Sequence, residues 1–313
     1  MTAKQTVGIF SHHDDLHAHL VADHIRKLGH RCHHIATDRL AYSRSLSWSS
    51  DRALAEIRDI NGQLVLPRDV HTVWWRRVMA GPAFDEGVGA SARALIPTEC
   101  RTAMTGLMFA DFQGRWVNDP AAEVRADNKL VQLRAAIRAG LTVPKTLVSA
   151  DPEQIRAFVE QEGDQAIVKV VRGTSEFSIP TRRITAADLT DDAALVACPA
   201  IYQALIEGEA HLRVHVFGQQ ATAIQLESTH LDWRPDLQVP MRQVALSDSL
   251  VSRFIGLVHD LGLAMGIIDA KINQNDEIVF LEINPQGQFL FMEGLTGVPL
   301  SSYMADFLTA SHG

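Results

Sequence analysis

The sequence predicts a protein of mixed α/β and α+β class, built from three lobes. Its N-terminal third alternates short apolar runs with helical spacing, as a βα lobe with a parallel sheet does. The last third is richest in strand-like runs, which favours antiparallel strands. A chain of 313 residues is too long for one small core. We therefore expect lobes at residues 1–118, 119–202 and 203–313.

The first lobe begins with a strand–helix–strand pattern. Apolar residues recur at helical spacing between two apolar runs, and Gly29 ends the helix. This order favours a small parallel sheet. The expected elements are strands at Val7–Phe10, Cys32–Ala36 and Thr72–Arg76, and helices at Leu16–Leu28 and Ser91–Phe109.

The second and third lobes combine amphipathic helices with short strands. The second lobe opens at the turn signal Asn118-Asp119-Pro120, and its strands flank a polar loop at Arg172–Glu176. The expected helices are Asn128–Ala139, one that starts at Asp151-Pro152, and Leu250–Leu261. The expected strands are Ala166–Val171, Phe177–Arg183, Ala200–Ile206, Leu212–Phe217, Ala221–Leu226, Ala264–Ile272 and Glu277–Ile283.

Composition excludes several functional classes. A formal charge of -8 argues against a protein that tracks nucleic-acid phosphates, so we expect no nucleic-acid partner. No apolar run approaches the roughly 18 residues of a spanning helix, so no membrane segment is expected. Three widely spaced cysteines fit reduced thiols in a cytoplasm better than a disulfide framework.

Oxygen-bearing side chains gather near the end of the chain. Glu282 and Asn284 are two apart at the end of an expected strand, so they leave the same face. Leu281 and Ile283 are expected on the opposite, buried face. Oxygen ligands without Cys or His suit Mg²⁺, which also takes phosphate oxygens and water. The pattern predicts a magnesium site.

The register of one hairpin sets the position of Asp269. If Asn275-Asp276 is a two-residue turn, Asp269 lies opposite Glu282 on the neighbouring strand. Opposed side chains have Cβ atoms roughly 5 Å apart, so a cation would let the two carboxylates coexist. The alternative is a solvated hairpin face that carries two acids.

The string FLEINPQGQ at Phe280–Gln288, with Asp269 about one hairpin upstream, resembles the ATP-grasp superfamily. The resemblance implies an ATP-grasp fold with an N-terminal Rossmann-like (pre-ATP-grasp) lobe, a small central α+β lobe and a C-terminal antiparallel α+β lobe. It also implies that Asp269, Glu282 and Asn284 hold Mg²⁺ between the β- and γ-phosphates of ATP.

Two lysines and one arginine stand where the resemblance implies contacts with phosphates. Lys129 opens an expected helix, and Lys169 lies in an apolar strand, where a lysine is costly unless it meets an anion. Lys169 could instead extend to solvent. Arg213 is implied to neutralise the transferred phosphoryl group, and its alternative is a surface arginine on an exposed sheet face.

The resemblance places the base and ribose of ATP along the segment after Tyr202. Leu205 and Ile206 are implied to enclose the purine, and Glu207 to reach the ribose hydroxyls. Related ligases commonly carry an acid at Ala204 or near His211, where this chain has Ala and His. The implied nucleotide contacts are Lys129, Lys169, Gln203, Ala204, Leu205, Ile206, Glu207 and His211.

Within the superfamily, the chain is most similar to the graspetide or microviridin-type maturases of ribosomal peptides, especially the actinobacterial branch. Such enzymes join Asp or Glu side chains of a precursor peptide to Ser/Thr hydroxyls or Lys amines, recognise a leader segment, and in several cases act as homodimers. The motifs that carry this likeness are Val73–Arg77, Trp116–Pro120, Asn128–Leu133, Gly140–Leu147, Asp232–Arg234 and Glu293–Leu300.

The implied function is therefore an ATP- and Mg²⁺-dependent ligase that acts on the acidic core of a precursor peptide. Arg76 and Arg77 are candidate contacts for that acidic core, or else a charge pair on an edge strand. The alternative function is an amino-acid or glutamate ligase that acts on a small molecule or a protein tail. A nucleotide-binding module without ligase activity fits less well, because both lysines and all three oxygen ligands are present.

Overall fold

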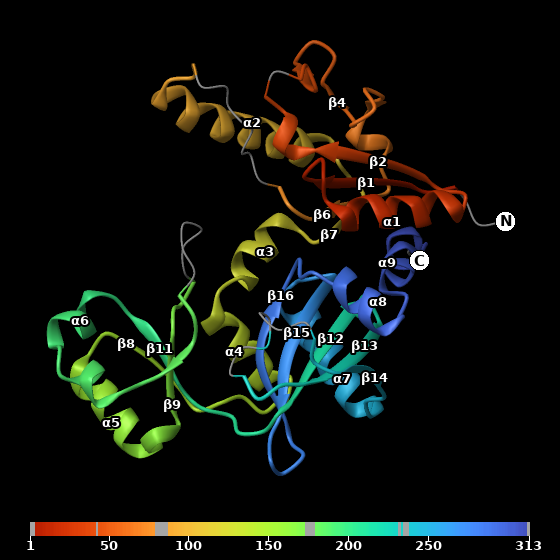
Figure 1. The fold of residues 1–313 in the computed structure, drawn as a ribbon. Coiled ribbons are helices and arrows are strands. Elements are labelled where there is room, and N and C mark those ends of the chain that lie inside the picture. Colours follow the sequence, from red (N-terminus) through yellow and green to blue (C-terminus); the bar gives the residue numbers. More distant parts are fainter. Residues whose placement is uncertain are drawn as a thin grey trace. The chain divides into compact units, whose positions relative to one another are not determined.

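The computed structural model describes residues 4–41, 43–78, 87–172, 179–230, 233 and 238–311, and these form two compact units (Figure 1). Unit 1 consists of residues 1–121, 263–265 and 286–313, and unit 2 of residues 122–262 and 266–285. The chain passes from unit 1 to unit 2 after residue 121 and returns to unit 1 at residue 286. The three lobes expected at residues 1–118, 119–202 and 203–313 stay a prediction.

A parallel four-stranded sheet in the order β2-β1-β6-β7 forms the centre of unit 1. The predicted strand–helix–strand beginning is confirmed. The helix α1 starts at Asp15, whose carboxylate accepts a hydrogen bond from the backbone N–H of His17. The bounds are β1 Thr6–Ser11, α1 Leu16–Lys27, β2 Arg31–Ala36, β6 Thr72–Trp75 and β7 Arg115–Val117.

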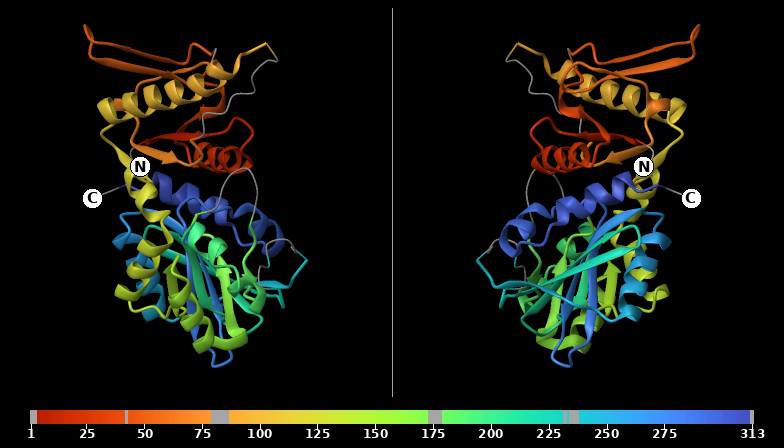
Figure 2. Two further views of the ribbon diagram at one scale, coloured as in Figure 1. Left: turned by 90° about the vertical axis from the view of Figure 1, so that its left-hand side faces the viewer. Right: turned by 90° about the vertical axis from the view of Figure 1, so that its right-hand side faces the viewer.

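The parallel sheet of unit 1 is covered on both faces (Figures 1 and 2). On one face α1 packs with α9 (Leu300–Thr309), which follows α8 (Leu290–Thr296). On the other face Phe10 and Trp75 pack against Met104 and Met108 of the long helix α2 (Ala90–Asp111). A small antiparallel sheet completes that side, with β3 Leu46–Ser49, β4 Leu54–Arg58 and β5 Leu64–Val65.

Unit 2 contains two antiparallel sheets, of which the smaller has the order β10-β9-β11-β8. Helix α5 packs against this sheet and starts with Pro152 after the capping residue Asp151, as the sequence predicted. Of the expected strand Phe177–Arg183, the described part contains β10. The bounds are β8 Thr146–Ser149, α5 Pro152–Glu162, β9 Ala166–Lys169, β10 Arg182–Arg183, α6 Asp192–Ala197 and β11 Ala200–Ala204.

The larger sheet of unit 2 has the order β14-β13-β12-β15-β16. Helices α4 and α7 contact each other and pack against this sheet. The amide of Gln132 on α4 bonds the backbone of Ile283 in both directions, which fixes α4 on β16. The bounds are α3 Pro120–Ala126, α4 Lys129–Arg138, β12 Ala210–Phe217, β13 Gln220–Glu227, β14 Met241–Val244, α7 Asp248–Asp260, β15 Met265–Ile272 and β16 Ile278–Asn284.

The β15–β16 hairpin carries the predicted pair of acids, and its register is confirmed: Asp269 lies opposite Glu282. The predicted two-residue turn is wrong. Asn273 bonds Glu277 across a longer turn, in which Asp276 has a φ of 58°. The longer turn shifts the pairing of β15 with β16 by one residue from the predicted register. An irregularity between Asp269 and Ala270 shifts the pairing back, so that Asp269 still faces Glu282. Leu281 is the extra residue of this β-bulge.

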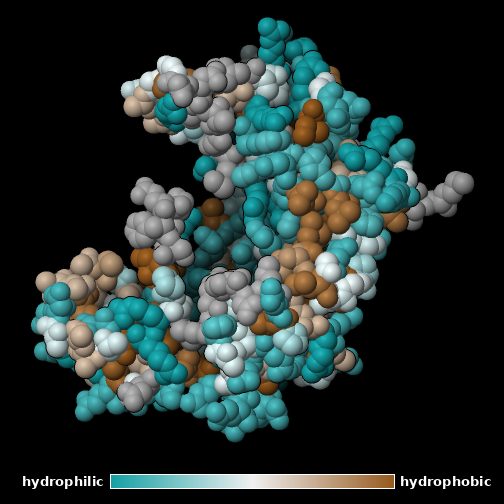
Figure 3. Space-filling view, in the orientation of Figure 1, coloured by the Kyte–Doolittle hydropathy of each residue, from teal (hydrophilic) through white to brown (hydrophobic). Residues whose placement is uncertain are grey.

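The outer surface of the described residues is consistent with an ordinary globular protein. Figure 3 shows a face on which hydrophilic residues predominate. Across the described part of the chain, every helix is too short or too polar to cross a membrane.

Candidate functional site

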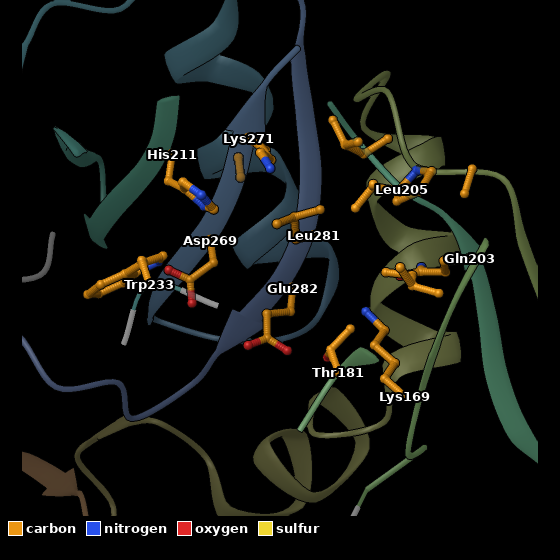
Figure 4. Close-up of a pocket in the computed structure, with 15 residues that line it drawn as sticks. Lys169, Thr181, Gln203, Leu205, His211, Trp233, Asp269, Lys271, Leu281 and Glu282 are labelled. Atoms are coloured by element: carbon orange, nitrogen blue, oxygen red, sulfur yellow. The ribbon is translucent and has the colours of Figure 1, made fainter. Parts of the chain in front are cut away.

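A pocket in unit 2 lies between its two sheets (Figure 4). One wall comes from β9, β11 and the segment that follows β11. The other wall comes from β12, β15 and β16. The lining residues are Pro144, Ile167, Lys169, Thr181, Gln203, Ala204, Leu205, Ile206, His211, Trp233, Asp269, Ala270, Lys271, Leu281 and Glu282.

The two carboxylates of the pocket are each met by a basic side chain. The guanidinium of Arg213 donates from Nη1 to Oδ1 of Asp269 over 2.6 Å. The ammonium of Lys129, at the start of α4, donates to Glu282. Arg213 is buried, with 6% of its surface exposed, so the predicted alternative of a surface arginine on an exposed sheet face does not hold.

Asp269 and Glu282 suit a magnesium ion. They are directly opposed on neighbouring strands, line the same pocket and are both partly exposed to it. Among the described residues, no group of three His, Cys, Asp or Glu side chains is placed to hold a metal. Two carboxylates with room for phosphate oxygens and water match the incomplete protein shell that Mg²⁺ normally accepts.

Strand β12 presents a polar column toward the site. His211, Arg213 and His215 alternate along the strand with Leu212, Val214 and Val216. Burial, and next the charge of Arg213, lower the pKa of His215 to about 3. His215 is therefore neutral near pH 7, and Arg213 is the cation that faces Asp269.

The segment that the sequence analysis expected at the base of ATP lines the pocket. Leu205 and Ile206 line the pocket next to Gln203, whose side-chain amide donates to Oγ1 of Thr146 over 2.8 Å. Lys169 enters from β9, on the wall that faces Glu282 (Figure 4).

Gly208 holds the connection between β11 and β12 against the end of β15. Its φ is +127°, and a Cβ at this position would lie 2.4 Å from the carbonyl oxygen of Ile272. No other residue fits without displacing the backbone. The close approach fixes the segment that follows β11 relative to the strand of Asp269.

Three predicted nucleotide or metal contacts lie outside the pocket lining: Lys129, which meets the pocket through its bond to Glu282, and Glu207 and Asn284. Glu207 is exposed, and its carboxylate accepts a hydrogen bond from the amide of Gln165 over 2.8 Å. Asn284 is exposed at the end of β16, two residues beyond Glu282 and therefore on the same face of the strand. The ribose role of Glu207 and the metal role of Asn284 stay predictions.

The two arginines predicted for substrate belong to unit 1 and differ in exposure. The side chain of Arg76 is fully buried, donates to Asp15 over 2.6 Å, and lies over the ring of Trp74. Burial by itself raises the pKa of the Asp15 carboxyl. The hydrogen bond from His17 and the charge of Arg76 lower this pKa by a larger amount, so it lies well below its ordinary value. Arg77 is partly exposed. A peptide carboxylate can reach Arg77 more readily than Arg76.

The sequence analysis missed several residues of the pocket wall. Leu281 was assigned to the opposite face, and the bulge is the reason for the error: it turns two successive residues, Leu281 and Glu282, toward the pocket. Lys271 could have been found, because it is two residues from Asp269 on the same strand face. Ala270 and Ile167 are neighbours in sequence of the predicted residues Asp269 and Lys169, and the remaining missed residues come from more distant parts of the chain: Pro144, Thr181 and Trp233.

Comparison with known proteins shows what the chain as a whole is similar to. The model of the MvdD pre-ATP-grasp domain matches residues 6–125. A curated relative, a probable alpha-L-glutamate ligase of Mannheimia succiniciproducens, is 23% identical over 199 residues. That match covers 61% of this chain and 66% of the relative's length.

Two solved structures are similar along nearly the whole chain. Macrocyclase MdnC of Microcystis aeruginosa MRC, bound with precursor peptide MdnA, is 27% identical with a TM-score of 0.86. The similarity covers 98% of this chain and 100% of that one. The ATP-grasp ligase PsnB, complexed with a minimal precursor, Mg and ADP, is 25% identical with a TM-score of 0.79, over 98% of each chain. The fold and these likenesses indicate an ATP-grasp ligase that is similar to ribosomal-peptide macrocyclases.

Proposed function

We propose that the protein activates Asp or Glu side-chain carboxylates of a ribosomal precursor peptide with ATP, and joins them to Ser/Thr hydroxyls or Lys amines. The observation that carries the proposal is the opposed pair Asp269 and Glu282 in a pocket that also holds Lys169, with Arg213 on the neighbouring strand bonded to Asp269. The likeness of the whole chain to a macrocyclase that was solved with its precursor peptide supports the choice of substrate.

In this proposal ATP and Mg²⁺ bind in the pocket of unit 2. Asp269 and Glu282, with Asn284 beside them, would hold Mg²⁺, which supplies positive charge against the phosphates when bound. Lys129 and Lys169 would contact the phosphates. The segment Gln203–Ile206 with His211 would enclose the base, since these residues line the pocket.

The reaction needs no nucleophile from the protein. A substrate carboxylate oxygen takes the terminal phosphoryl group, ADP leaves, and an acylphosphate forms. The peptide hydroxyl or amine then attacks the acyl carbon, loses its proton, and phosphate leaves with one carboxylate oxygen. Arg213 neutralises charge that develops on the transferred group, and positioning provides the rest of the catalysis.

The proposed partner is a precursor peptide with a leader and an acidic core. Arg77, which is partly exposed, and Arg76, which is buried beside it, are the proposed contacts for core carboxylates. A homodimer and a cytoplasmic location complete the proposal, because several enzymes of this type act as homodimers and the reaction consumes ATP.

The second candidate is an amino-acid or glutamate ligase that acts on a small molecule or a protein tail. The curated glutamate ligase of Mannheimia succiniciproducens favours it, although that match covers 61% of this chain. The macrocyclase likeness extends over 98% of the chain and includes unit 1.

Phosphate release separates the two candidates. We expect release with Mg-ATP and a precursor peptide encoded beside the enzyme, and none with free glutamate and amino acids. Arg77→Ala should slow the peptide reaction at least tenfold, while ADP binding by calorimetry stays unchanged. Release with free amino acids alone would instead support the second candidate.

A further inference from the structure

Lys271 on β15 is a buried cation in the wall of the nucleotide pocket. Only 7% of its surface is exposed, and it lines the pocket together with Leu281 and Leu205. Within the described parts of the chain, its ammonium group makes no hydrogen bond and no ion pair. Lys129 and Lys145, by contrast, each pair with a glutamate.

The burial of this ammonium group is unfavourable in the protein alone. A charged amine loses its hydration when it is buried, and only a hydrogen-bond acceptor or an opposite charge compensates that loss. Burial also lowers the pKa of Lys271, and an acceptor on a ligand bound in the pocket would compensate the lost hydration. A lysine offers three N–H donors and no acceptor, so it selects an acceptor atom on the ligand.

The position of Lys271 indicates which part of the ligand it meets. It lies two residues beyond Asp269 along β15, roughly 7 Å farther from the carboxylates. In Figure 4 Lys271 and Leu205 lie toward one end of the pocket, and Glu282 and Lys169 toward the other. The charged end suits phosphates and Mg²⁺, and the end with leucines suits the nucleoside.

We propose that Lys271 binds the nucleoside part of the nucleotide by donating a hydrogen bond to a ring nitrogen of the base or to a ribose oxygen. The proposal rests on the proposed binding of ATP in this pocket. The proposed role of Lys271 also supplies a contact for the ribose of the nucleotide. Glu207 does not provide that contact in this structure, because it is turned toward Gln165.

The first test measures ADP binding by calorimetry, without peptide, for the wild type, Lys271→Met and Lys145→Met. Methionine keeps the length of the side chain and removes the donors. We expect Lys271→Met to weaken ADP binding roughly tenfold or more, the usual effect of losing a hydrogen bond to a charged group. Lys145 is exposed and paired with Glu162, so Lys145→Met should bind ADP like the wild type.

Two further measurements locate the contact and control for folding. Magnesium pyrophosphate should bind equally to wild type and Lys271→Met, because it lacks the nucleoside. ADP analogues identify the acceptor atom. If it is a ribose oxygen, wild type and Lys271→Met should bind 2′-deoxy-ADP or 3′-deoxy-ADP with equal affinity. If it is the N7 nitrogen of the base, the two proteins should bind 7-deaza-ADP with equal affinity. Lys271→Met should unfold at the same temperature as the wild type or higher, since a buried charge is removed.

Equal ADP affinity of wild type and Lys271→Met would overturn the inference. An equal loss for pyrophosphate would also overturn it, because Lys271 would then act at the phosphates. If the wild type itself failed to bind ADP, the proposed function would be wrong, which is a distinguishable result.

Discussion

At the scale of single residues, the buried His215 on β12 makes the stability of the protein depend on pH. His215 ordinarily titrates near 6.5, and burial beside Arg213 lowers its pKa to about 3. The folded state therefore binds a proton less readily than the unfolded state. The contribution of His215 to stability is complete above pH 6.5 and is lost as the pH falls from 6.5 toward 3.

We predict that His215→Val reduces the acid sensitivity of the protein. Valine cannot take up a proton, so the unfolding temperature of the variant should fall less than that of the wild type between pH 6.5 and pH 4. Thermal unfolding followed at several pH values measures the difference. Parallel curves for the two proteins would show that His215 does not titrate as its burial indicates.

Much of the site could be predicted from residue types, and the part that could not depends on local geometry. Asp269 opposite Glu282 followed from a strand period of two and one hairpin. The prediction succeeded although its turn was wrong, because the bulge at Leu281 compensated for the longer turn. A bulge of this kind leaves no reliable mark in a single sequence, so the inward position of Leu281 could not be foreseen.

At the scale of elements, α8 begins with a cap from a distant helix. The first backbone N–H groups of a helix need acceptors, and Phe289 at the cap position has no side-chain acceptor. The ring nitrogen Nε2 of His17 on α1 accepts from the N–H groups of Phe289 and Leu290, at 3.0 and 3.2 Å. His17 thereby fixes the segment that follows the end of β16.

We predict that His17→Phe destabilises the protein by about 1–3 kcal/mol, because two buried N–H groups lose their acceptor while a ring of similar shape remains. Urea unfolding of this variant and of the control His24→Phe, a partly exposed site on the same helix, measures the effect. Equal losses of stability in the two variants would indicate a helix-propensity effect and not a cap.

The long periodic elements were predictable, and several of the short ones were not. Helices α1, α4 and α7 and the strands around the acids follow apolar spacing and clear end signals. Strands β3, β5 and β7 have four residues or fewer, and β8 follows Pro144. Such segments are stabilised by tertiary partners, which a local pattern does not reveal.

At the scale of the whole molecule, each of the two units is built from segments that are separated in the sequence. Residues 286–313 return to unit 1 directly after the strand of Glu282. Contacts of α9 with α1 and with β6 explain the return, since they bury apolar residues more than 200 positions apart in sequence. A prediction of lobes along the sequence could not anticipate this, because spacing within a segment carries no information about its distant partner.

The central claim is that the pocket of unit 2 is the site of an ATP-dependent carboxylate ligase. The most direct test is mass spectrometry of the precursor peptide after incubation with Mg-ATP and wild type, Glu282→Gln or Glu277→Gln. Glu277 lies in the same hairpin outside the pocket lining and bonds Thr142, so it is the matched control. Wild type and Glu277→Gln should remove one water mass per bond formed, and Glu282→Gln, folded by thermal unfolding, should remove none. Full conversion by Glu282→Gln would contradict the account.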